Sequence, residues 1–339
     1  MARITLDQLS FRYDGATQDT LKGLDLEITD GEAHALLGAS GSGKTTLLNL
    51  LSGLSSPTGG ALCFDGLDVS TQRGRERGVA QVFQFPVLYE ALDVKSNLAF
   101  PLRNRGVAEA EIKQRLDFIA DEMELGHLLG RRVGGLSLFE KQLVAVGKAL
   151  MRRDVSVVLL DEPLTAVEPK TKWRLRQTLR RAQADTGVTM VYVTHDQTEA
   201  LTFADRVSVL ADGRILQTAT PDDIYAAPQS EFVGHFVGSP GMNFLPAAAL
   251  GTPPGDKIGF RPEWARLGET GELQVVVTRV RTLGTREGVP VGITEAATTY
   301  GEVSVRGATQ FSVGAQVRLH IPHYLVFRDR RLVAQVGTQ

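Results

Sequence analysis

The residues with the clearest chemistry form a glycine-rich segment close to the N-terminus. Glycines let a backbone loop wrap phosphate groups with its N–H groups, a lysine adds positive charge, and a threonine hydroxyl suits Mg²⁺. The segment follows the pattern Gly-x-x-x-x-Gly-Lys-Thr, and its candidate binding residues are Gly38, Ser40, Gly41, Ser42, Gly43, Lys44, Thr45 and the adjacent Thr46. The pattern predicts a site for a nucleoside triphosphate.

A pair of carboxylates supplies the second half of this chemistry. Asp161 and Glu162 follow the apolar run 157–160, which is typical of a strand buried on both faces. Parallel sheets place ligand chemistry at the C-terminal ends of their strands. Asp161 is therefore predicted to hold Mg²⁺ through water, and Glu162 to be the general base for an attacking water. The alternative is a pair of solvated carboxylates that close a core strand.

Both motifs need secondary structure to position them. The apolar run 34–37 predicts a strand before the glycine loop, and the helical spacing of apolar residues in 45–54 predicts a helix after it. The alternation that follows is typical of a parallel sheet, so residues 1–236 are predicted to form one α/β unit. Its further strands are expected at 155–160, 188–193 and 206–210, with helices at 170–183 and 197–203.

Three segments differ from this alternation. Short runs separated by turns in 4–28 predict a β-rich edge, and helical periodicity dominates 94–152, which predicts a helical insertion. Beyond 238–241, short Val- and Thr-rich runs predict a second domain of strands, arranged as a small barrel and occupying 237–339.

Composition limits the class of protein. The 339 residues are 42 % hydrophobic and 22 % charged, with a net charge of −2 and one cysteine, which is typical of a globular chain and excludes disorder. There is no basic field for nucleic acid and no apolar run of about 18 residues for a membrane span. The N-terminus shows no apolar signal region, so a reducing cytoplasm is the expected compartment.

Three further segments connect these motifs to a known family. A segment ending in Gln84 precedes the helical insertion, Ser137 opens a helix before the Asp161 strand, and His195 ends the next strand. With the glycine loop and the carboxylate pair, they resemble the Q-loop, signature, Walker A, Walker B and switch histidine of the ATP-binding cassette (ABC) family. The details resemble the ATPase subunits of maltose-type sugar importers.

The resemblance implies a P-loop ABC nucleotide-binding domain of the α/β class, with a helical subdomain at about 86–152 and an antiparallel β edge. It implies a C-terminal OB-like (TOBE/MOP-type) domain, ATP as substrate and Mg²⁺ as cofactor. Thr45, Gln84 and Asp161 would bind the metal, with Gln84 able to contact either Mg²⁺ or the attacking water through its amide. Tyr13 would stack on adenine. His195 would hold the water and the γ-phosphate in line with Glu162.

The resemblance also implies partners. Segment 85–103 would receive a short helix of the transmembrane permease subunits, and an extracytoplasmic solute-binding protein would complete the system. The chain would then lie peripherally on the cytoplasmic face of the inner membrane. The solute would be a sugar, a sugar alcohol or a glycerol-like molecule, and no nucleic-acid partner is expected.

The signature is the motif that differs from the family pattern. The family reads Leu-Ser-Gly-Gly-Gln, whereas Leu136 is followed here by Ser137, Leu138, Phe139 and Glu140. Bulky side chains thus replace glycines that allow close approach to the neighbouring subunit's ATP, and an acid replaces an amide. Ser137 and Glu140 also fit a capping box that closes a helix start on itself. The element 165–168 is altered as well.

These changes favour an asymmetric heterodimer, in which a second ATPase subunit with an intact signature completes the ATP site of this chain. A homodimer is the alternative. A non-catalytic, ATP-binding regulatory cassette is a second functional hypothesis, and the presence of Glu162 and His195 argues against it. A cassette protein acting on nucleic acid or ribosomes is a third, which the lack of a second cassette or a basic arm disfavours.

Overall fold

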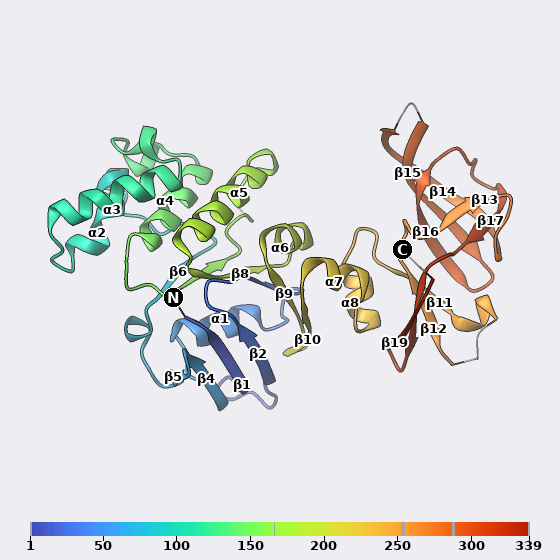
Figure 1. Cartoon of the computed structure of the whole chain (residues 1–339), viewed down its shortest axis with the longest axis horizontal. Coiled ribbons are helices and arrows are strands. Elements are labelled where there is room, and N and C mark those ends of the chain that lie inside the picture. The colour runs from blue at the N-terminus through green and yellow to red at the C-terminus, as the bar shows by residue number, and fades with distance from the viewer. Residues whose placement is uncertain (1, 166, 252–254, 287–288, 338–339) are drawn as a thin grey trace. The chain divides into compact units, whose positions relative to one another are not determined.

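The computed structural model describes residues 2–165, 167–251, 255–286 and 289–337 (Figure 1). The chain divides into two compact units, Met1–Pro221 and Asp222–Gln339. Residues 222–236, which the sequence pattern assigns to the α/β unit, cluster with the C-terminal residues instead.

A largely parallel sheet forms the centre of the first unit. The described strands lie in the order β10 (Arg214–Ala219), β9 (Arg206–Ala211), β3 (Ala33–Leu37), β8 (Thr189–Thr194), β7 (Val157–Asp161) and β6 (Val79–Val82). Neighbours from β9 to β6 are parallel, and β10 is antiparallel to β9. The expected alternation of strands and helices is confirmed.

Helices cover both faces of this sheet (Figure 1). On one side lies α1 (Lys44–Ser52), and on the other lie α3 (Glu109–Glu122), α4 (Leu138–Leu150) and α5 (Pro169–Thr186). Side chains alternate along β7, so Val157 and Leu159 pack in the core that contains α1, while Val158 and Leu160 pack against the other helices. Burial on both faces explains the unbroken apolar sequence of this strand.

An antiparallel sheet packs in the same core as α1. Its described strands lie in the order β2 (Leu21–Ile28), β1 (Ile4–Phe11), β4 (Gly59–Phe64) and β5 (Leu67–Asp68). This is the β-rich edge predicted from the sequence. Ile4 and Leu6 share a core with Leu47 and Leu51, so the sheet fixes the helix that follows the glycine loop.

The helical insertion consists of α2 (Val94–Arg103), α3 and α4, with short 3₁₀ turns η2 (Gly126–Leu128) and η3 (Val133–Gly135) between α3 and α4. Asp93 caps α2 and Ser137 caps α4. The unit is completed by η1 (Gly74–Glu76) and α6 (Gln197–Phe203). Within the described residues, none of the helices combines the length and the apolar character that a membrane span requires.

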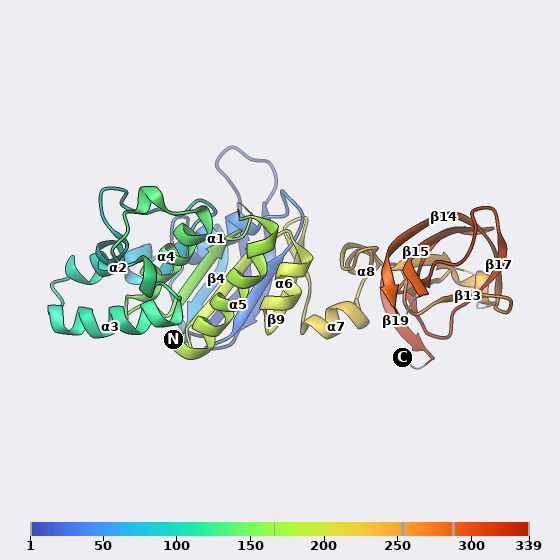
Figure 2. The ribbon, with the colours of Figure 1, turned by 90° about the horizontal axis from the view of Figure 1, so that it is seen from above.

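The second unit contains α7 (Pro221–Ala226), α8 (Glu231–Phe236), the turn η4 (Ala247–Leu250) and antiparallel strands, in agreement with the predicted run of strands. One sheet has the order β11 (Asn243–Pro246), β12 (Lys257–Phe260), β18 (Tyr324–Arg328), β19 (Arg331–Val336). The other has the order β13 (Arg266–Gly268), β17 (Gln316–His320), β14 (Leu273–Arg286), β15 (Val289–Thr298), β16 (Gly301–Ala308). Figure 2 shows that β14 is curved, and its pairing with β15 shifts register at two points.

A buried arginine connects the helices and strands of this unit. Arg261 follows β12, is fully buried, and donates hydrogen bonds to the carbonyl oxygens of Tyr225 (2.9 and 2.7 Å), Gly234 (2.9 Å) and Val237. Its guanidinium carbon lies 4.1 Å from the centroid of the Tyr225 ring. Burial lowers the pKa of Arg261 to about 10, so the side chain stays protonated at neutral pH.

We predict that Arg261→Met lowers the free energy of unfolding of this unit by about 3 kcal/mol, because several buried carbonyls lose a charged donor. The measurement is urea unfolding followed by the fluorescence of Trp264 in a Trp173→Phe background. Arg279→Met is the matched control, because Arg279 forms an exposed ion pair with Glu295. Loss of this ion pair is expected to lower the free energy of unfolding by at most about 1 kcal/mol. Equal midpoints for the two variants would contradict this role of Arg261.

Candidate active site

The C-terminal ends of three adjacent strands bring the predicted motifs together. In the ladders of this sheet, Leu37 of β3 pairs with Thr194 of β8, and Asp161 of β7 pairs with Val193. The backbone N–H of Glu162 also donates to the carbonyl oxygen of Val193, at 2.9 Å. The glycine loop, the carboxylate pair and the histidine segment therefore meet at one edge, as parallel strands require.

The glycine loop needs glycine at two positions for steric reasons. A Cβ atom on Gly38 would lie 2.4 Å from the carbonyl oxygen of Leu210. Gly43 has a φ of 107° and a Cβ there would lie 2.7 Å from the side chain of Leu21. Gly43 caps α1 without any side-chain hydrogen bond, so the first N–H groups of the helix are not capped by a side chain. This is the arrangement that binds phosphate at a helix start.

Two polar side chains of the loop fit a phosphate group. The hydroxyl oxygen of Ser42 is buried and has no hydrogen-bond partner among the described residues. Lys44 lies buried against the loop and donates to the carbonyl oxygens of Gly38 (2.8 Å) and Ala39 (3.0 Å). Because a buried hydroxyl normally finds a partner, the free donor at Ser42 and the ammonium beside it suit an anionic ligand.

The charges of the two motifs influence one another. Burial lowers the pKa of Lys44, and the charges of Glu162 and Asp161 oppose this shift. Burial and the neighbouring charge of Glu162 raise the pKa of Asp161, and Lys44 opposes that shift. The three groups are therefore close enough to affect one another, although 117 residues separate Lys44 from Asp161 in the chain.

Glu162 is held from two sides. One carboxylate oxygen lies 3.1 Å from Nδ1 of His195, and the other accepts a hydrogen bond from the hydroxyl of Thr165, also at 3.1 Å. The backbone of Glu162 has a φ of 45°, an uncommon conformation for a residue other than glycine. The carboxylate is thus oriented by a histidine and a threonine while it remains partly exposed to solvent.

Thr165 is the contact that the motifs did not predict. In sequence, segment 165–168 stands out only because it differs from the family pattern. The spacing of three residues from Glu162 is the available signal, because a turn brings such side chains together. Ala166, in the same segment, lies outside the described residues.

The remaining candidate ligands lie around the same edge of the sheet. The hydroxyl of Tyr13 is 3.0 Å from that of Thr46 in α1, and the Tyr13 ring packs edge-on against Phe11 while 49 % of the residue is exposed. Thr45 lies in the first turn of α1, beside Lys44. Gln84 is half-buried two residues after β6, whose last residue pairs with Leu160, next to Asp161.

The signature segment forms the capping box predicted from its spacing. The hydroxyl of Ser137 accepts from the backbone N–H of Glu140 at 3.2 Å, and the Glu140 carboxylate accepts from the N–H (2.7 Å) and the hydroxyl (2.9 Å) of Ser137. Arg131 forms an ion pair with the other carboxylate oxygen at 3.3 Å. The hydroxyl hydrogen of Ser137 is therefore already donated within the segment.

Glu140 is consequently not a lone charge at the start of α4. Burial raises the pKa of its carboxyl, but the hydrogen bonds from Ser137 and the charge of Arg131 outweigh this effect, so the net shift is downward. Phe139 packs against the core and lies 5.8 Å below the Arg174 guanidinium. The segment is thus obstructed by bulk and by internal hydrogen bonds more than by an isolated negative charge.

Comparison with known proteins identifies the family. A sequence model of the family described as "ABC transporter" matches residues 21–165. The chain is 37 % identical to the sn-glycerol-3-phosphate import ATP-binding protein UgpC 3 of Rhizobium etli, over 94 % of both chains. It is 42 % identical to the sulfoquinovosyl glycerol transport ATP-binding protein SmoE of Agrobacterium fabrum, over 77 % of this chain and 71 % of the relative.

Solved structures support the same family assignment. The cbiO1 subunit of the Clostridium perfringens transporter complex cbiONQ matches 66 % of this chain and 90 % of its own, with a TM-score of 0.62 and 28 % identity. The ATP-binding cassette MJ0796, bound to ADP and phosphate, matches 64 % of this chain and 98 % of its own, with a TM-score of 0.56 and 27 % identity. The chain belongs to the ABC transporter family: it has the P-loop ABC fold and is an ATPase that binds ATP.

We predict that Thr165→Val lowers kcat for ATP hydrolysis about tenfold without a matching change in ATP affinity, because Glu162 loses a hydrogen bond that orients it. Thr165→Ser keeps the hydroxyl and is expected to retain most of the activity. Both variants are measured in the same assembly as the unmodified chain, at saturating ATP. Full activity of the valine variant, or equal loss in the serine variant, would contradict this role of Thr165.

Proposed function

We propose that this chain is the ATP-hydrolysing subunit of a membrane importer for a sugar, a sugar alcohol or a glycerol-like solute. The observation that carries the proposal is the joined site, in which Lys44, Asp161, Glu162 and His195 meet at one edge of the sheet. Support for the solute class comes from the relatives, which are named for the import of glycerol phosphate and for the transport of a sugar-linked glycerol.

The roles of the site residues follow from their chemistry. The glycine loop and Lys44 bind the phosphates, and Tyr13 offers its exposed ring to adenine. Thr45, Gln84 and Asp161 are the proposed ligands of Mg²⁺, which supplies charge stabilisation to phosphoryl transfer. Glu162 accepts a proton from the attacking water, and His195 orients Glu162 through the contact at Nδ1.

The proposed contact with the permease lies along 85–103. Phe85 and Val87 are exposed there, and a cavity of about 380 Å³ opens beside them, lined by Tyr89, Phe100 and Lys148 among others. Exposed apolar side chains next to a cavity suit the apolar face of a short helix. The chain would thus lie on the cytoplasmic face of the cell membrane and, with the permease, would serve an extracytoplasmic solute-binding protein.

The proposal of a second ATPase subunit rests on the signature segment. In this family a signature acts on the ATP bound by the opposite subunit, so this chain would offer its neighbour a segment that is closed on itself. Its own site would need the intact signature of a different subunit. We therefore propose a heterodimer in which the two ATP sites differ in rate.

For the C-terminal residues we propose an OB-like domain of the TOBE type with a regulatory function. The support is an antiparallel arrangement of short strands after residue 237, with a strand that bends at register shifts. Functionally, 1–236 would be the nucleotide-binding domain, with its helical subdomain at about 86–152. Helices α7 and α8 would then connect it to 237–339.

We predict that opening the signature activates the isolated chain. The triple variant Leu138→Gly, Phe139→Gly and Glu140→Gln removes the bulk and frees the start of α4 for phosphate. ATP hydrolysis by this variant alone is expected to rise about tenfold or more over the unmodified chain and to become cooperative in protein concentration. The measurement is phosphate release by the purified chain.

The control adds Glu162→Gln to the triple variant, which is expected to abolish hydrolysis while ATP binding persists. Rapid cooperative hydrolysis by the unmodified chain alone, with no gain in the triple variant, would contradict the heterodimer. It would leave the chain an importer ATPase that works as a homodimer.

A further inference from the structure

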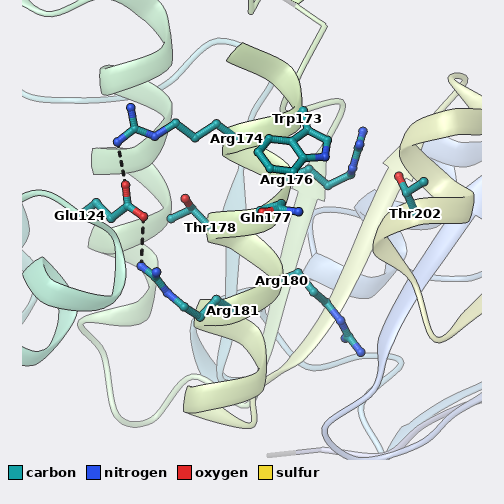
Figure 3. Close-up of a pocket in the computed structure, with 9 residues that line it drawn as sticks. All are labelled: Glu124, Trp173, Arg174, Arg176, Gln177, Thr178, Arg180, Arg181 and Thr202. Carbon is teal, nitrogen blue, oxygen red and sulfur yellow. Dashed lines mark hydrogen bonds and ion pairs between the residues drawn. The ribbon is translucent and has the colours of Figure 1, made fainter. Parts of the chain in front are cut away.

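A basic groove on α5 has no part in the chemistry described above. The cavity has a volume of about 590 Å³. We call it the α5 groove, and Figure 3 shows the residues that line it, which are Glu124, Trp173, Arg174, Arg176, Gln177, Thr178, Arg180, Arg181 and Thr202. Four of these are arginines and one is a carboxylate. A chain with a net charge of −2 thus gathers positive charge on one helix.

Three of the arginines already have partners. Arg174 and Arg181 extend toward Glu124, at 2.7 and 3.4 Å from its carboxylate oxygens (Figure 3). Arg180 pairs with Asp205. These contacts fix the walls of the groove, and the guanidinium groups keep further N–H donors.

Three other side chains of the groove, those of Trp173, Arg176 and Gln177, are available to a ligand. Within the described part of the chain, Arg176 makes no hydrogen bond or ion pair, and neither Gln177 nor the indole N–H of Trp173 has a hydrogen-bond partner. Trp173 is also 59 % exposed. Residues 173, 176, 177 and 180 share one face of α5, because they are three or four positions apart. The groove thus presents an unpaired guanidinium beside an exposed aromatic ring (Figure 3).

We propose that the α5 groove is a docking site for an acidic, extended segment of a partner protein. Arg176 and Arg180 extend from the helix in different directions, and Arg180 is already paired with Asp205, so Arg176 is the anchor for a carboxylate (Figure 3). Acidic side chains two residues apart in an extended peptide point to the same side. One such carboxylate binds Arg176, and an apolar side chain of the peptide packs on the exposed ring of Trp173.

The composition of the groove favours a protein partner over a small anion. Tryptophan and arginine are the side chains that contribute most often to the energy of protein interfaces. A small dianion would use the guanidinium groups and would leave Trp173 in solvent. A peptide uses both Trp173 and Arg176, and its carboxylate gains the planar, two-point contact that a guanidinium group offers.

The test uses a fluorescent pentapeptide of alternating glutamate and leucine, titrated with the full-length chain at low salt and followed by anisotropy. We expect saturable binding that weakens as salt is added. Arg176→Gln should weaken it about tenfold, because one charged contact is lost, and Trp173→Ala should weaken it by a similar factor. The matched control is Arg75→Gln, which removes an exposed positive charge outside the groove and should leave binding unchanged.

Comparison ligands separate the alternatives. A peptide with glutamine in place of glutamate should bind at least about tenfold more weakly than the original peptide. Succinate, measured as a competitor, should also bind at least about tenfold more weakly. Succinate binding as tight as that of the peptide would overturn the proposal in favour of a small-anion site. The proposal would also be overturned if Arg176→Gln left peptide binding intact. A third contrary result would be binding of phosphatidylglycerol vesicles through Arg176 without any binding of the peptide. None of these outcomes depends on ATP hydrolysis, so they leave the proposed function untouched.

Discussion

The parallel pairing of β3, β8 and β7 is the constraint on which the site depends. Backbone ladders set the ends of these strands level, so the glycine loop, His195 and the Asp161–Glu162 pair emerge at the same edge. Cores on both faces hold the strands in place, because a shift of one strand would disrupt close packing on two sides. The catalytic geometry is therefore a consequence of how the sheet is packed.

Around this edge, positions are adjusted by local hydrogen bonds. Thr165 and His195 hold the two oxygens of Glu162, whereas Ser137 and Glu140 hold each other at the start of α4. The first arrangement orients the carboxylate that we propose as the general base. The second occupies the Ser137 hydroxyl and the backbone N–H groups of Ser137 and Glu140. The proposed hydrolytic residues and the segment 137–140 are thus both ordered by short-range hydrogen bonds.

Much of this could be predicted from the sequence where the signal is local or periodic. The unbroken run 157–160 predicted a doubly covered strand, and the spacing of Ser137 and Glu140 predicted the capping box. The hold of Thr165 on Glu162 depends on a turn conformation that no motif encodes. The contacts of Arg261 with the backbone of α8 and those of Arg174 with Glu124 join residues that are far apart in the sequence. Neither these contacts nor the α5 groove could therefore be read from local patterns.

The most direct test of the account is a cryo-EM structure of the chain with Glu162→Gln, assembled with its transporter and saturated with ATP. The account predicts ATP on the glycine loop of this chain, with the hydrogen bonds between Ser137 and Glu140 intact and no phosphate in contact with residues 137–140. A closed pair of identical copies, in which residues 137–140 of each grip the γ-phosphate held by the other, would contradict it.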